Sequence, residues 1–90
     1  MLTARVSSEA LVRSQRFEAG DLPLTVRVTN PDRQRACEFE VAYFVEGHVV
    51  RVEYERLDCG EWREYQMTSG GEVVNTGRTD ITITWAPTGF

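Results

Sequence analysis

Turn-forming residues interrupt this 90-residue chain at short intervals, and that spacing limits the folds open to it. The runs between the turns are short and alternate apolar with polar residues. Such alternation is typical of strands with one buried face, and closely spaced turns favour an all-β sandwich or barrel over helix–strand units. The turn signals are EAGD (18–21), TNPD (29–32), EG (46–47), DCG (58–60), TSGG (68–71), NTG (75–77) and PTG (87–89).

Four stretches have the clearest strand pattern, because each is rich in β-branched and aromatic residues with period-2 alternation. They are residues 22–29, 37–45, 48–57 and 79–85. In the first, Pro23 is expected near the strand start or on an edge, because it cannot donate to a ladder. In the last, Trp85 shares a face with Ile81 and Ile83, so we expect it in the core.

Three further stretches have a weaker strand pattern. Residues 2–6 and 61–67 are interpreted as strands. Residues 8–18 fit either a short helix opened by Ser8 or a strand ending at Phe17, and we favour the strand because one lone helical turn would need its own packing site. The sequence therefore predicts one domain over 1–90, a small antiparallel β-sandwich of about seven short strands.

The strand order, the short turns and the segment LTVRVTNP before a long hairpin resemble an immunoglobulin-like β-sandwich over roughly residues 20–86. The chain lacks the Cys…Trp…Cys spacing of true immunoglobulin domains. The resemblance implies the fold, and it implies a module of the kind that is built into surface, fibre and appendage proteins.

The strongest local prediction is a hairpin over residues 37–56, with Glu46-Gly47 as a two-residue loop. A regular ladder from that loop places Phe39, Val41 and Tyr43 on the same face as Val50, Val52 and Tyr54, and we expect this face in the core. The other face then carries two pairs of glutamates directly opposite each other: Glu40 with Glu53, and Glu38 with Glu55.

Like charges that face each other destabilise a sheet by a few tenths to ~1 kcal/mol per pair, so something should offset these pairs. We expect neighbouring arginines to do so, from among Arg27, Arg51, Arg56 and Arg63. The alternatives are a basic partner surface and a calcium site. The same face ends in Phe44 and Val49, which form either an apolar contact patch or a surface that a second sheet covers.

The sequence contains no recognisable catalytic constellation. His48 is the only histidine, and in the predicted hairpin it lies ~26 Å along the strand from Cys37 at ~3.3 Å per residue. One histidine and two cysteines do not supply a zinc site, and SGG (69–71) lacks the lysine of a phosphate loop. We therefore expect no enzymatic activity, cofactor or metal. Cys37 and Cys59 are compatible with a disulfide or with two free thiols.

The charge distribution bears on the choice of partner. The net charge is −4, and residues 38–64 hold eight acidic residues against three arginines. This acidity disfavours general nucleic-acid binding, which depends on neutralising phosphates. No apolar run approaches the ~20 residues of a membrane span, and the first residues do not resemble a signal peptide. The compartment stays open between the cytoplasm and a larger assembly.

We interpret the chain as a non-enzymatic module that docks a basic protein surface through an acidic sheet face or an edge strand. The expected contact residues are Glu38, Glu40, Glu53, Glu55, Phe44, Val49 and Trp62. The alternatives are a small stand-alone inhibitor or immunity-type protein, and a carbohydrate-binding sandwich that uses Trp62 as an aromatic platform. The sequence leaves the partner and the oligomeric state open.

Overall fold

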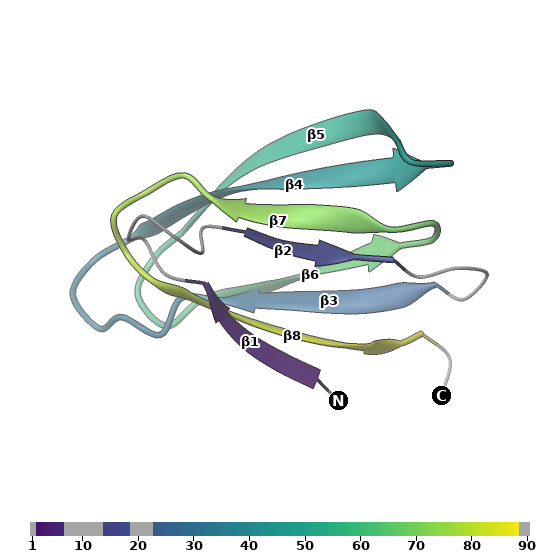
Figure 1. The fold of residues 1–90 in the computed structure, drawn as a ribbon. Helices are drawn as coiled ribbons and strands as arrows, with labels where there is room; N and C mark the ends of the chain where they lie inside the picture. Colours follow the sequence, from purple (N-terminus) through teal and green to yellow (C-terminus); the bar gives the residue numbers. More distant parts are fainter. Residues whose placement is uncertain (1, 7–13, 19–22, 89–90) are drawn as a thin grey trace.

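The computed structural model describes residues 2–6, 14–18 and 23–88, which form eight strands and no helix. The strands build two antiparallel four-stranded sheets, the first in the order β1-β8-β3-β6 and the second in the order β2-β7-β4-β5 (Figure 1). Their bounds are β1 Leu2–Val6, β2 Ser14–Phe17, β3 Leu24–Thr29, β4 Cys37–Val45, β5 His48–Leu57, β6 Trp62–Met67, β7 Gly71–Asn75 and β8 Ile81–Pro87. The all-β prediction is confirmed.

One hydrophobic core lies between the two sheets and takes residues from both. The first sheet contributes Val26, Val28, Tyr65, Met67, Ile81 and Ile83, and the second contributes Phe17, Cys37, Phe39, Val41, Leu57 and Val73. Burying a large apolar side chain contributes ~1.5–3 kcal/mol, so this layer supplies most of the favourable free energy of folding. Trp85 packs against the core, with its ring 4.9 Å from that of Phe17 in an edge-to-face arrangement, as the sequence predicted.

The strand predictions agree with the structure where the alternation is long. The predicted strands at 37–45 and 48–57 coincide with β4 and β5. Pro23 directly precedes β3, as expected of a residue without a backbone donor. Of the uncertain stretch 8–18, β2 covers Ser14–Phe17, which favours the strand interpretation there, whereas residues 8–13 lie outside the described residues.

The sequence did not predict β7, although it lies between β2 and β4 in the second sheet. Its residues fall between two turn signals, which left too short a run to recognise. Gly71 explains one of these signals, because a Cβ there would lie 2.5 Å from the Ala42 carbonyl oxygen and 2.6 Å from Met67 Sδ. This glycine is required by close packing inside a strand and is not a flexible turn residue.

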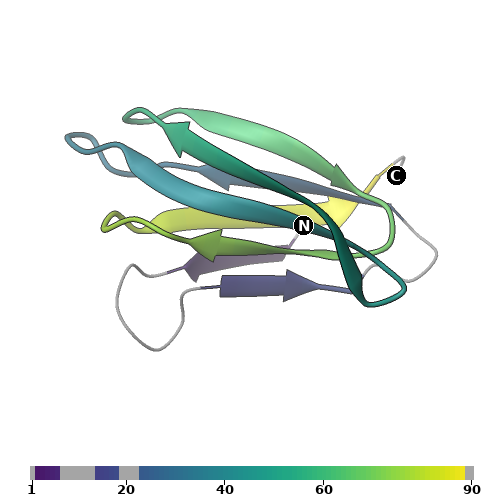
Figure 2. The same ribbon diagram turned by 90° about the horizontal axis from the view of Figure 1, so that it is seen from above.

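The connections decide which strands lie at the edges. Among the described strands, β4 and β5 are the one consecutive pair that are neighbours in a sheet; the members of every other consecutive pair lie in different sheets (Figures 1 and 2). As a result β5 ends the second sheet and β6 ends the first. Both β5 and β6 therefore have backbone groups along one side that none of the described strands pairs.

A buried asparagine forms hydrogen bonds that hold two loops together at one end of the sandwich. Asn30 is fully buried, and its Nδ2 donates to three backbone carbonyl oxygens at 2.8–3.2 Å, those of Arg35, Leu57 and Asp58. Its Oδ1 accepts from the Asp32 backbone N–H at 3.0 Å. The β3–β4 connection is thus tied to the end of β5 through one satisfied amide, as a buried polar group requires.

We expect Asn30→Asp to lower the free energy of unfolding by about 2–4 kcal/mol, because a carboxylate would face carbonyl oxygens that now accept hydrogen bonds. Urea denaturation measures this change. The matched control is Gln34→Glu, the same amide-to-acid exchange at an exposed position, which should change stability by no more than ~0.5 kcal/mol. Equal losses in both variants would contradict the role of Asn30.

Candidate functional site

The β4–β5 hairpin has the predicted loop but a different ladder. Glu46 and Gly47 both have positive φ, 51° and 78°, as a two-residue turn with the right twist requires. Val45 lies opposite His48 and Phe44 opposite Val49, as predicted. The register then shifts, so that Tyr43 lies opposite Arg51. Val50 is therefore an extra residue in β5, which is a β-bulge.

The bulge overturns the predicted glutamate pairs. Glu40 lies opposite Tyr54 and Glu38 opposite Arg56, whereas Glu53 and Glu55 lie opposite the buried residues Val41 and Phe39. The prediction of two adjacent Glu–Glu pairs is wrong because a shift of one residue exchanges the two faces of a strand. The four glutamates are divided between the two sides of the sheet.

The inner side of β5 carries charged residues along the open border of the sandwich. Glu55 forms an ion pair with Arg63 of β6, which joins the two sheets, and Glu55 raises the pKa of Arg63. Glu53 lies 3.4 Å from the Arg51 guanidinium and accepts a hydrogen bond from the Tyr43 hydroxyl at 3.3 Å.

Arg51 and Arg63, two of the four arginines named from the sequence, neutralise glutamates of β5, as expected. The glutamates that they neutralise do not face other glutamates, however, contrary to the prediction from the regular ladder. Burial raises the pKa of Tyr43, and the neighbouring Glu53 adds to this effect. Of the other two, Arg56 lies opposite Glu38, and Arg27 pairs with Glu64 on the first sheet.

The outer side of β5 is apolar and exposed. Tyr54 is 76% exposed, Val50 61% and Val52 39%. The prediction that these residues lie in the core is wrong for the same reason, since the bulge turns them outward. Val49, which precedes the bulge, is also exposed. An edge strand with such a row presents both unpaired backbone groups and apolar side chains.

The predicted apolar tip is only half present. Val49 is exposed, but Phe44 is buried, and the Arg16 guanidinium from β2 lies 4.8 Å from the centre of its ring. Phe44 is therefore covered by a residue of its own sheet. Of the two alternatives for this tip, Val49 fits the exposed contact patch, whereas Phe44 is covered, by its own sheet and not by the other one.

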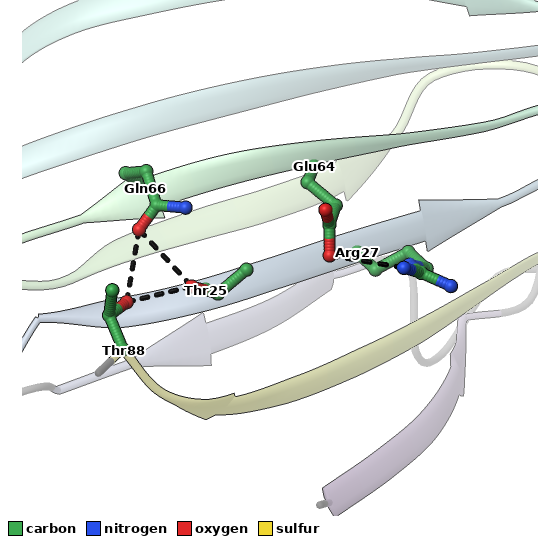
Figure 3. A network of polar contacts seen from close by, with 5 residues as sticks. All are labelled: Thr25, Arg27, Glu64, Gln66 and Thr88. Atoms are coloured by element: carbon green, nitrogen blue, oxygen red, sulfur yellow. Dashed lines mark hydrogen bonds and ion pairs between the residues drawn. The ribbon is translucent and has the colours of Figure 1, made fainter. Parts of the chain in front are cut away.

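A second surface lies on the outer face of the first sheet, around Trp62 of β6. Trp62 is 52% exposed, and the Arg27 guanidinium lies 4.0 Å from its ring centre and 3.3 Å from Glu64. Nearby, Gln66 Oε1 accepts hydrogen bonds from the Thr25 and Thr88 hydroxyls, which lie 2.7 Å apart (Figure 3). A shallow groove of about 300 Å³ runs along this face, lined by Thr25, Arg27, Thr29, Glu64, Thr84, Trp85 and Ala86.

The two cysteines are free and differ in exposure. Cys37 is buried opposite Leu57, and Cys59 is exposed. Burial raises the pKa of the Cys37 thiol. His48 lies at the turn end of the hairpin, and Cys37 at its far end, in agreement with the predicted separation. The raised pKa of Cys37 is opposite to the shift that activates a thiol as a nucleophile.

The described residues contain no group of three or more side chains of the metal-binding types. No described helix has the length and apolarity to cross a bilayer. No family model, curated protein or solved structure matches the chain. A function for the chain is therefore inferred from its own geometry.

The two thiols should differ in their rate of modification by a water-soluble disulfide reagent. We expect Cys59 to react at the rate of an exposed thiol. Cys37 should react at least about 1,000-fold more slowly, because it becomes accessible only when the core opens. Cys59→Ser isolates the slow thiol, and denaturant should equalise the rates of the two cysteines. Similar rates in the folded protein would contradict the burial of Cys37.

Proposed function

We propose that this domain is a non-enzymatic protein-binding module that docks its partner along β5. The observation that carries the proposal is the exposed row Val50, Val52 and Tyr54 on an edge strand. A partner strand that pairs with this edge would satisfy the free backbone groups, and its side chains would cover the apolar row.

The sequence predicted docking through an acidic sheet face or an edge strand, and the structure bears differently on the two. The edge strand remains as the docking element. The acidic contribution is reduced, because Glu53 and Glu55 are engaged by Arg51 and Arg63 within the chain. Glu40 lies opposite Tyr54 beside the apolar row, so a lysine or arginine that flanks an apolar segment in the partner would suit this border.

We also infer that the architecture is immunoglobulin-like. Two four-stranded antiparallel sheets with connections that repeatedly change sheet support this assignment. The fold assignment does not by itself imply a function. An inhibitor or immunity-type role would use the same β5 surface and would differ only in the identity of the partner.

The binding role is tested by comparing two exposed aromatics on different edge strands, Tyr54 on β5 and Trp62 on β6. We expect Tyr54→Lys to abolish capture of the partner from the native source, since it places a charge in the apolar row. Trp62→Lys, the matched control on β6, should leave capture unchanged. Both positions are more than half exposed, so both variants should melt within a few degrees of the wild type. Capture that is lost only with Trp62→Lys would contradict docking along β5.

Saccharide binding on the outer face of the first sheet is the second candidate, and the exposed Trp62 beside the groove supports it. An indole ring offers an apolar face for a sugar ring, and the surrounding hydroxyl, amide and carboxylate groups suit its hydroxyls. We expect the tryptophan emission to shift on addition of a matching neutral glycan, and Trp62→Phe to remove that shift. An unchanged response in Trp62→Phe would assign the signal to Trp85, which lines the groove, and contradict the role of Trp62 as the aromatic platform.

A further inference from the structure

We infer that the partner of the β5 edge is a second copy of this chain, paired antiparallel around a two-fold axis at Val52. This inference rests on the proposed role of β5 as a docking strand and adds the identity of the partner. The pairing would join the second sheets of two copies into one continuous sheet in which the two β5 strands lie at the centre.

The sequence of β5 beyond the bulge is self-complementary in this arrangement. An axis at Val52 places Arg51 of each copy opposite Glu53 of the other, on the inner side of the sheet. On the outer side, Val52 meets Val52 and Val50 meets Tyr54. Two pairs of opposite charge and three apolar pairs are the cross-strand contacts that stabilise an antiparallel ladder.

The charges also select this register over its neighbours. A two-fold axis perpendicular to the sheet keeps each face on its own side, so the register can shift only in steps of two residues. A shift in one direction places Arg51 opposite Arg51, and a shift in the other places Glu53 opposite Glu53. Both neighbouring registers therefore contain a like-charge pair, which the register centred on Val52 avoids.

The side chains that would form the new pairs are accessible. The Arg51 side chain is 62% exposed and that of Glu53 34%, and the two lie 3.4 Å apart within the chain. The ion pair within the chain holds both charges at the border of the sheet, where a second copy would meet them. Tyr54 and Val50 are the two most exposed of the large apolar residues in the described part of the chain.

The bulge limits the length of the contact. Regular pairing with a second copy would end near Val50, where the ladder of β5 is interrupted. The paired segment is therefore residues 50–54, which is short compared with a stable interface of standard size. We expect weak, reversible self-association that becomes visible at high protein concentration.

Sedimentation velocity over a range of protein concentrations tests the pairing with two charge variants, Arg51→Glu and Glu53→Arg. Each single variant places like charges across the axis, so we expect each to self-associate at least about tenfold more weakly than the wild type. An equimolar mixture of the two should dimerise again, because one copy then carries two acids and the other two arginines. The double variant R51E/E53R should self-associate like the wild type, since the swap restores both pairs.

The mixture separates pairing from a general effect on folding. Each single variant also loses the ion pair within the chain, and mixing cannot restore that contact. Thermal melting of each variant confirms that it is folded. A mixture that stays monomeric, or a wild type that stays monomeric up to about 1 mM, would overturn the inference. If the wild type is monomeric but a different protein is still captured in a Tyr54-dependent manner, self-pairing fails while the proposed docking function stands.

Discussion

The extra residue in β5 determines what the rest of this surface can do. Opposite Tyr43 the ladder advances by one residue, and every side chain between Arg51 and Leu57 changes side as a result. Leu57 enters the core, Glu53 and Glu55 reach the border between the sheets, and Tyr54 faces solvent. A regular ladder would have placed two pairs of carboxylates together on the outside of the sandwich and a tyrosine inside it.

The position of β5 at the edge makes this arrangement tolerable. Glutamates on the inner face of a central strand would be buried without solvent, at a large cost in free energy. At the border of an edge strand they keep contact with water and meet arginines from β5 itself and from β6. Ion pairs of this kind contribute at most about 1 kcal/mol each, so they add little to the stability of the fold.

The sequence predicted the fold class and the strands because long alternation and turn residues are local signals. The bulge was missed because alternation alone does not show which face of each half of β5 points toward the core. Two signs of it exist in the chain: the consecutive valines Val49 and Val50, which break the alternation, and Leu57, whose parity matches the glutamates.

β7 was missed because Gly71 is required by a close backbone approach from another strand, which no local pattern records. The exposure of Trp62 was anticipated, whereas its contact with Arg27 depends on the pairing of β3 with β6.

A single NMR measurement tests the register of the β4–β5 hairpin most directly. In an antiparallel ladder, the backbone Hα atoms of alternate opposing residues approach each other closely and give strong cross-strand NOEs. The structure requires such a contact between Glu40 and Tyr54, and another between Ala42 and Val52. An Hα–Hα contact between Glu40 and Glu53 would instead establish the regular ladder, return Tyr54 to the inner face and contradict the bulge at Val50.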